Sequence, residues 1–450
     1  MNSEKQDLTR GPLGRKILLF SLPLMISNVL QVLFNMADIA VVGRFGGPTA
    51  LGSVGSTAIL VTLFTGFLIG VGTGVNVLVA RCVGARSEKD ARDTVHTSFL
   101  IMAAVGLVLM AVGLLLTRPM LRLLRTKEVL LPGAALYLRI YFLGMPAMAL
   151  FNYGNAVFSA VGDTKKPLRY LSAAGVLNVA LNLFFVLVCH LDVAGVAMAS
   201  VISQCVSAIW IIRALAREQG MHALRFSQLR LNRTTCREVL ALGLPSGGQN
   251  AIFALANLFV QAGVNSFDAV MVSGNSAAAN ADGLIYDVMA AFYTACASFM
   301  SQNLGAGRKS RVMKSYLISL GYSFGVGAVL GMGLLAFGRP FLSLFTRDAQ
   351  VVEAGMQRLT IMSFSYAVSA VMDCTIAASR GLGKSVVPMI LVILGSCVFR
   401  VAWVYTVFAS FHTIPSLYLL YVFSWTLTGA AEVVYFARCY RRLVAPLPPD

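Results

Sequence analysis

The sequence predicts an all-α membrane protein with twelve transmembrane helices, arranged as two six-helix lobes related by pseudo-two-fold symmetry. Hydrophobic residues make up 57% of the 450 residues, charged residues make up only 12%, and the mean hydropathy is +0.76. Soluble globular chains are about half apolar and about a quarter charged. The third observation is an internal repeat at an offset near 222 residues. A steady offset of this kind indicates a duplicated architecture.

Twelve apolar segments are each long enough to cross a bilayer, because about 20 helical residues at about 1.5 Å each span the hydrocarbon core. In chain order they are residues 17–42, 50–80, 94–116, 134–160, 168–189, 193–216, 238–264, 276–301, 315–337, 354–379, 385–410 and 414–437. The first is too long for the apolar core of a cleavable signal, so we expect none. With a cytoplasmic N-terminus, 26 of the 36 Lys and Arg residues fall in cytoplasmic segments. This bias predicts a multi-pass protein of the bacterial inner membrane with both termini in the cytoplasm.

The repeat divides the chain into halves of six spans each. The matching residues are Pro23 and Pro245, Asn28 and Asn250, Asn35 and Asn257, Phe45 and Phe267, Gly84 and Gly305, Arg118 and Arg339, Gly162 and Gly383, and Pro167 and Pro388. An even number of spans gives both halves the same orientation, so their axis should follow the membrane normal with a cavity between them. We predict an N-lobe at 1–216, a cytoplasmic linker at 217–237 and a C-lobe at 238–450.

Asp38 is the only ionisable residue between residues 17 and 42. An ionised Asp at mid-membrane costs about 2.5–3.5 kcal/mol, so it should face the bundle interior with a partner or carry a proton. Gln31, Asn35 and Asp38 share one helix face with Asn28. This polar stripe predicts the lining of a pathway, with Asp38 and Asn35 in ion coupling and Gln31 in substrate binding.

Amides on two further spans are expected to converge on Asp38. Asn152 and Asn155 lie on one face of the fourth span, and Asn178 and Asn182 share a face of the fifth. Amides can hold a carboxylate or a desolvated cation. We assign Asn178 and Asn182 to ion coupling, and Asn152 and Asn155 to substrate binding. The alternative is that these amides only join helices, as is common in membrane bundles.

In the second half, Asp282, Tyr286 and Met289 share one face of the eighth span. An acid beside aromatic rings and a thioether suits an organic cation. The alternative places Asp282 near the outer end of its span, where water would solvate it. Asn257 and Asp373 are assigned to the same substrate site.

Arg400 lies deep in the eleventh span, where a lone cation would be costly. We therefore predict a structural ion pair between Arg400 and Glu432, or between Arg400 and Asp373.

The eight cysteines show no metal spacing and are interpreted as packing residues. No basic run is interleaved with aromatic residues, so we expect no nucleic-acid partner. Nothing indicates an enzyme, a metal or a cofactor.

Several motifs together resemble the multidrug and toxic compound extrusion (MATE) transporters. They are Thr9-Arg10-Gly11-Pro12, Leu22-Pro23, Asp38-Ile39-Ala40-Val41-Val42-Gly43-Arg44-Phe45-Gly46, Asn265-Ser266-Phe267, Gln302-Asn303-Leu304-Gly305-Ala306-Gly307, Arg380-Gly381-Leu382-Gly383 and Phe399-Arg400-Val401-Ala402-Trp403. The resemblance covers almost the whole chain. It implies an antiporter that exports organic, often cationic compounds in exchange for protons or sodium ions. It also places the family's first-helix acid at Asp38 and its fifth-helix asparagine at Asn178.

The chain departs from that family's pattern at three positions. Some members carry Asp where this chain has Asn182, others carry an acid where it has Asn257, and Asp268 stands where Gly usually follows Asn-Ser-Phe. Fewer acids leave proton or sodium coupling open. The expected partners are small organic cations, H⁺ or Na⁺ and the bilayer, for a monomer with no cofactor. The alternative functions are a flippase for a lipid-linked or amphipathic precursor, which the few buried basic residues disfavour, and a non-transporting scaffold or receptor.

Overall fold

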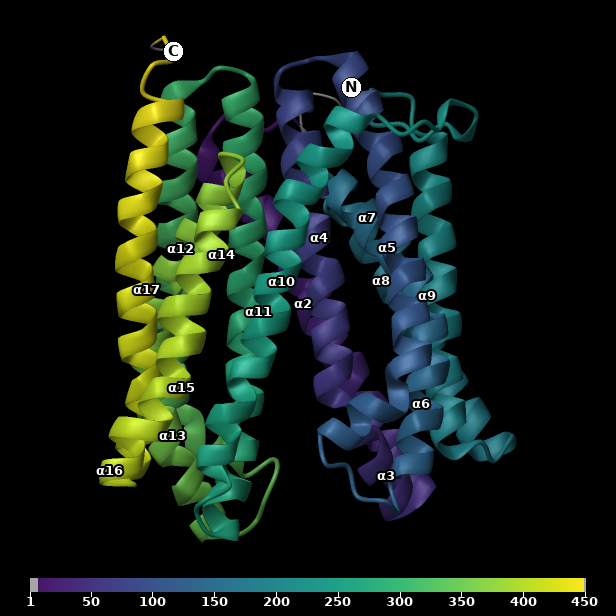
Figure 1. Ribbon diagram of the computed structural model, residues 1–450, viewed down its shortest axis with the longest axis vertical. Coiled ribbons are helices and arrows are strands. Elements are labelled where there is room, and N and C mark those ends of the chain that lie inside the picture. Colours follow the sequence, from purple (N-terminus) through teal and green to yellow (C-terminus); the bar gives the residue numbers. More distant parts are fainter. Residues whose placement is uncertain (1–6, 449–450) are drawn as a thin grey trace. The chain divides into compact units, whose positions relative to one another are not determined.

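The computed structural model describes residues 7–448, and within them the protein is helical (Figure 1). The helices of the first half are α2 (Leu13–Val41), α3 (Gly47–Gly55), α4 (Ala58–Gly84), α5 (Glu88–Leu123), α6 (Leu131–Leu143), α7 (Met145–Ala160), α8 (Lys165–Leu183) and α9 (Asp192–Arg217). Those of the second half are α10 (Arg233–Val264), α11 (Ala269–Gly305), α12 (Lys309–Leu342), α13 (Ala349–Gly381), α14 (Val386–Val392), α15 (Phe399–Trp403), α16 (Ala409–Phe411) and α17 (Ile414–Leu443). Two π-helical segments join α14, α15 and α16 into one helix, Val386–Phe411.

The predicted membrane fold is confirmed. Among the described residues, eleven helices are long and apolar enough to span a membrane, and the number is twelve if the bent pair α6 and α7 is one span. The main difference from the predicted spans follows α2. Gly47 has a φ of +80°, a conformation that costs glycine little, and Pro48 lies in the first turn of α3. Residues 50–55, predicted within the second span, therefore belong to a separate short helix.

The chain separates into two compact units. Unit 1 contains Ile26–Gly247 and unit 2 contains Leu8–Met25 and Gly248–Asp450, and the described residue Asp7 belongs to unit 1. The division falls inside α2 and α10, within three residues of Pro23 and Pro245. A proline inside a helix removes one backbone hydrogen bond and weakens it locally. The lobes predicted from the repeat keep each of these two helices whole, so unit boundaries and repeat boundaries differ.

Each unit is built around an equivalent central helix. In unit 1, α7 packs against α4, α5 and α9, and in unit 2, α13 packs against α11, α12 and α17. The 221-residue offset aligns α6 and α7 with α13. The first copy bends by 47° at the break that precedes Pro146, whereas the second has Ala367 at the equivalent position and continues unbroken. The bend is explained by proline, which cannot donate the helical hydrogen bond at that point.

Helix α4 and the first part of α10 meet through glycines in unit 1. A methyl group on Gly70 would lie 2.4 Å from the backbone nitrogen of Gly247, and one on Gly74 would lie 2.7 Å from that of Gly243. Each helix therefore presents a pair of glycines four residues apart. Such pairs let two membrane helices approach to backbone contact.

We expect Gly70→Ala to destabilise the protein by about 1–3 kcal/mol, the usual cost of overpacking. Gly72→Ala is the matched control, because its nearest neighbour would be the Asn152 carbonyl oxygen at 3.7 Å. The control should be neutral or gain up to about 1 kcal/mol of helix propensity. Thermal unfolding of the two purified variants measures the difference. Equal melting temperatures would contradict a close contact at Gly70.

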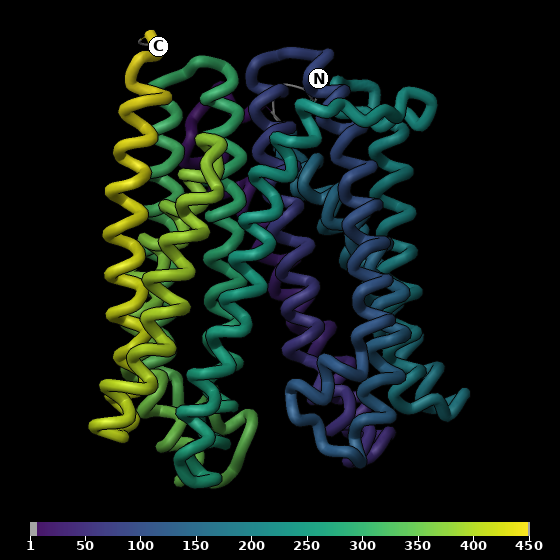
Figure 2. Tube along the Cα trace, in the orientation of Figure 1, coloured from purple at the N-terminus to yellow at the C-terminus, as the bar shows by residue number. Residues whose placement is uncertain are grey.

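The segment between α9 and α10 is fixed to the start of α5 (Figure 2). The backbone nitrogen of Arg225 donates to His96 Nε2 at 3.0 Å, and the Arg230 guanidinium pairs with Asp93 at 2.8 Å. Thr97 donates to the Arg230 carbonyl at 3.3 Å and accepts from the Asn232 nitrogen at 3.0 Å. The linker is thus an ordered part of unit 1.

Candidate functional site

Asp38 lies in α2 within unit 1 and is half-buried. Asn182 Nδ2 donates to its Oδ1, and Ser200 Oγ donates to its Oδ2 at 3.1 Å. Asn178 closes a ring, because it accepts from Asn182 Nδ2 at 3.3 Å and donates to Ser200 Oγ at 3.4 Å. The structure therefore brings together Asp38, Asn178 and Asn182, as the sequence predicts.

The ring is made by three helices whose local sequence places each group. Asn178 and Asn182 are four residues apart on α8, so their amides lie on one face, and both are buried. Ser200 of α9 is buried and completes the set, although sequence reasoning missed it. The available signal was a hydroxyl row on α9, in which Ser200, Ser203 and Ser207 follow at helical spacing and are all buried.

The hydrogen bonds of the ring match an ionised Asp38. Both carboxylate oxygens accept, and each donor is neutral. If Asp38 takes a proton, one of its oxygens must donate. Ser200 can reverse its role, whereas the Asn182 NH₂ group can only donate. Asn182 Oδ1, in contrast, is a buried acceptor without a hydrogen-bond partner among the described residues. Proton binding therefore requires the ring to rearrange.

Other first-half candidates lie outside this ring. Asn35 and Gln31 are exposed on α2, one and two turns before Asp38. Asn152 is half-buried on α7, and its amide donates to the Met148 carbonyl of its own helix at 2.9 Å. Asn155 is half-buried one turn further along α7. Their assignments to ion coupling and substrate binding remain predictions.

Asp282 is buried in unit 2 and its charge is compensated, which corrects the expected cation-binding face. Arg358 of α13 pairs with one carboxylate oxygen, and the Tyr366 hydroxyl donates to the other. Arg358 also donates to Asn275, which accepts from Tyr418 at 2.5 Å. An organic cation would have to displace a buried guanidinium to reach this acid. The solvated alternative is wrong as well, since the residue is only 6% exposed.

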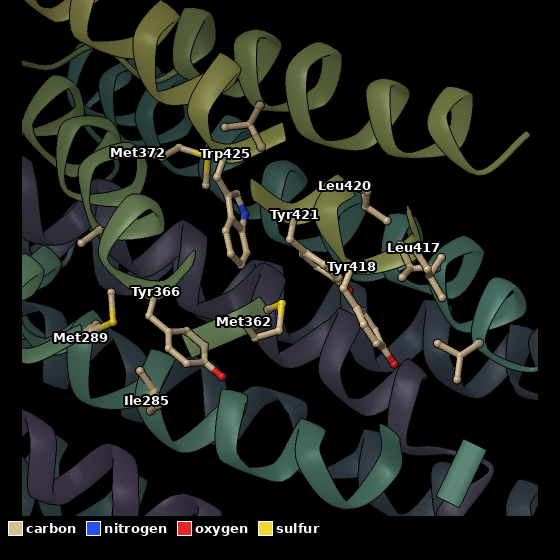
Figure 3. Packing of buried hydrophobic residues seen from close by; sticks show 14 of the residues in the cluster. Ile285, Met289, Met362, Tyr366, Met372, Leu417, Tyr418, Leu420, Tyr421 and Trp425 are labelled. Carbon is tan, nitrogen blue, oxygen red and sulfur yellow. The ribbon is translucent and has the colours of Figure 1, made fainter. Parts of the chain in front are cut away.

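Tyr286 and Met289 belong to the apolar core of unit 2 rather than to an open wall. Met289 is fully buried, and the Tyr286 ring meets Tyr366 and Trp425 edge-on with centroids 5.7 and 5.9 Å apart. Figure 3 shows Met289, Tyr366 and Trp425 among the buried side chains of this cluster. The stripe on α11 is therefore a packing face.

The predicted ion pair between Arg400 and Glu432 is wrong. Arg400 is fully buried and donates to Asn257 Oδ1 at 3.0 Å and to Ser424 Oγ at 3.3 Å. Its guanidinium also lies 4.6 Å from the ring centroids of Phe253 and Tyr421, and π faces attract a cation. Neutral amide, hydroxyl and aromatic groups take the place of a carboxylate.

Helix geometry explains the missing pair. Arg400 lies level with Ser424, and Glu432 follows eight residues later on α17, about 12 Å along the axis. Glu432 is fully buried, and neither of its carboxylate oxygens has a hydrogen-bond partner in the described part of the chain.

Asp373 is half-buried on α13 and forms no ion pair with Arg400 within residues 7–448. Asn257 is occupied by Arg400, which does not support its assignment to substrate binding.

The family model MatE matches this chain twice, at residues 23–184 and again at 245–406. The two matches begin at Pro23 and Pro245 and are offset by 222 residues, as is the repeat. The chain belongs to the MatE family. The resemblance to MATE transporters is thereby confirmed, and each half of the chain matches the family model once.

Individual MatE relatives agree with this membership. The chain is 27% identical over 361 residues to the probable multidrug resistance protein YpnP of Bacillus subtilis, covering 80% of each chain. It is 26% identical over 359 residues to the FAD transporter of Shewanella oneidensis, covering 78% of each. Among solved structures, a MOP superfamily transporter from Pyrococcus furiosus, described as having a binding pocket of reverse polarity, matches with a TM-score of 0.91 at 21% identity. That match covers 98% of this chain and 99% of the other, and shows the fold.

Proposed function

We propose that this MatE protein is a secondary active multidrug antiporter that exports organic cations in exchange for protons, with sodium as the alternative ion. The observation that carries the proposal is the Asp38 ring. It holds a carboxylate inside a membrane-spanning helix with neutral donors only. Ionisable groups in membrane spans mark ion or proton pathways by default. Three of the relatives found are named as probable multidrug resistance proteins.

In the proposed cycle, the proton and the substrate cation use Asp38 in turn. The ionised acid, with both oxygens accepting, is the form that a cation stabilises. Protonation removes that charge and forces Ser200 or Asn182 to change its hydrogen bonds. The rearranged ring then biases α2, which Pro23 makes pliable, toward a second conformation. The proton and the substrate cation are then exchanged across the membrane, because ionised and protonated Asp38 favour different conformations of α2.

The driving force can be estimated from this exchange. A monovalent cation exchanged for one proton moves no net charge, so the membrane potential does not contribute. Each pH unit then supplies about 1.4 kcal/mol, enough for about a tenfold accumulation. A second coupling ion would add about 2.3 kcal/mol for each 100 mV of membrane potential.

The buried cations of unit 2 favour this function over a flippase for lipid-linked precursors. A flippase needs basic groups free to hold phosphate. Arg358 is neutralised by Asp282, and Arg400 lies between aromatic rings. Arg358 already has an anionic partner and Arg400 is fully buried, which disfavours an anionic head group at either position.

We propose that the protein lies in the bacterial inner membrane with both termini in the cytoplasm. Both ends of the described chain contact the same region of unit 2, which supports placing both termini on the same side of the membrane. The Leu8 nitrogen donates to Gln302 Oε1 at 3.2 Å, and Lys309 Nζ donates to the Ala445 carbonyl at 2.5 Å. Gln302 and Lys309 flank the short connection between α11 and α12.

Transport by the purified protein in liposomes tests the proposal. We expect efflux of a fluorescent organic cation when a proton gradient is imposed, and none without a gradient. A sodium gradient is imposed separately at equal pH. FAD serves as an anionic test compound, because one relative is named an FAD transporter. Flux of FAD but not of the cation would overturn the cationic substrate class, and flux that follows neither gradient would overturn antiport.

A further inference from the structure

An apolar groove of about 520 Å³ opens on unit 1, and Asp38 is not among its lining residues. Helices α5, α7 and α9 form most of its walls, and Leu143 at the end of α6 and Phe226 of the linker complete them. The residues that matter for the argument are Phe99, Ala147, Ile209, Arg213 and Phe226. Its volume falls within the range of about 300–1,000 Å³ typical of small-molecule sites.

The groove has one charged residue. Arg213 is exposed and lies one turn before the end of α9, on the side where the linker is docked. Among the described residues, Arg213 forms no ion pair. Of the other nearby cations, Arg225 donates to the Ala216 carbonyl at 2.6 Å, Arg230 pairs with Asp93, and Arg217 does not line the groove. Arg213 is therefore the guanidinium that a ligand in the groove would meet.

Two observations indicate that Arg213 lies close to a membrane interface. Trp210, one turn earlier on α9, is 38% exposed, and exposed tryptophans gather at the head-group level. The basic linker marks the end of unit 1 that we place in the cytoplasm, where the leaflet is rich in anionic lipid. An apolar groove with a cation at its interfacial end matches the shape and charge of one lipid class.

We infer that this groove binds an anionic phospholipid of the cytoplasmic leaflet, with an acyl chain along the groove and the phosphate at Arg213. Burial of each CH₂ group favours the chain, and the guanidinium favours an anionic over a zwitterionic head group. The lipid would also contact the linker. Phe226 meets Phe99 edge-on with ring centroids 5.9 Å apart, so an occupied groove supports the docked position of residues 225–232.

The test is lipid retention by the full-length protein. The protein is delipidated in detergent and mixed with phosphatidylglycerol or with phosphatidylcholine of the same acyl chains. Native mass spectrometry then measures how many lipid molecules each sample retains. We expect preferential retention of one phosphatidylglycerol. Arg213→Gln should lower the affinity for phosphatidylglycerol about fivefold, which is the contribution expected of one basic residue near an anionic membrane surface. Arg217→Gln is the matched control, since Arg217 is exposed one turn further along α9 and does not line the groove.

Two further variants fill the groove with a larger side chain and leave Arg213 unchanged. Ala147→Phe and Ile209→Trp replace a half-buried and an exposed wall residue, so at least one should fold, as judged by its melting temperature. We expect both lipids to be lost from either variant. Equal retention of the two lipids by the wild type, or unchanged retention in a folded groove-filling variant, would overturn the inference. Displacement of phosphatidylglycerol by the transported cation would also overturn it, because the groove would then belong to the substrate. The readout does not depend on transport, so it fails separately from the antiporter proposal.

Discussion

Replacing Asp38 by Asn is expected to abolish proton-driven efflux while leaving the protein folded. The substitution keeps the size of the side chain but removes the only group in the ring that can exchange a proton. It also places an NH₂ group opposite either Asn182 Nδ2 or Ser200 Oγ, both of which donate to Asp38. Ser200 can turn to accept, so the ring can close again without a charge. We expect efflux at the level of the passive leak.

The pH response separates loss of coupling from simple loss of activity. Wild-type efflux should rise as the external pH falls below the internal pH, because protons then load Asp38 from outside. Ser200→Ala is the companion variant, since it removes one hydrogen bond at 3.1 Å but keeps the carboxyl group. It should still transport, with its pH response displaced. If Asp38→Asn retained a wild-type pH response, the coupling group would have to lie elsewhere.

The sequence was sufficient to predict the fold because membrane helices are specified locally. About 20 consecutive apolar residues define a span whatever the rest of the chain does. The Asp38 site was also predictable in part, because Asn178 and Asn182 share a face at a spacing of four residues. Ser200 was missed because a hydroxyl on an otherwise apolar helix has many structural uses.

Pairing between distant helices was not predictable from periodicity. The stripe on α11 gives the direction of Asp282 but does not say which residue faces it. Arg358 is 76 positions away, near the start of a predicted span, where a basic residue is usually solvated. Arg400 shows the same limit, because a buried guanidinium can be held by aromatic faces and a neutral amide as well as by an acid. Helical spacing assigns faces, and only packing assigns partners.

Removal of Asp282 is expected to cause the largest loss of stability in unit 2. Arg358 is only 7% exposed, and Asp282→Ala leaves its guanidinium with Asn275 as the remaining hydrogen-bond acceptor among the described residues. Breaking one side of a buried ion pair costs about 3–5 kcal/mol, because the other charge stays buried without compensation. Thermal unfolding in detergent measures the loss. Tyr366→Phe, which removes one hydrogen bond to the same carboxylate but leaves the ion pair, should cost less, about 1.5–3 kcal/mol.

A double-mutant cycle distinguishes a buried pair from general damage to the core. Arg358→Met with Asp282→Ala removes both charges and keeps an apolar side chain over the ring of Tyr418, where the guanidinium lies at 5.1 Å. The double variant should therefore be more stable than Asp282→Ala alone, because no buried charge is left without a partner. If the two losses simply added, Asp282 and Arg358 would not act as a pair, and Asp282 would again be a candidate for binding cations.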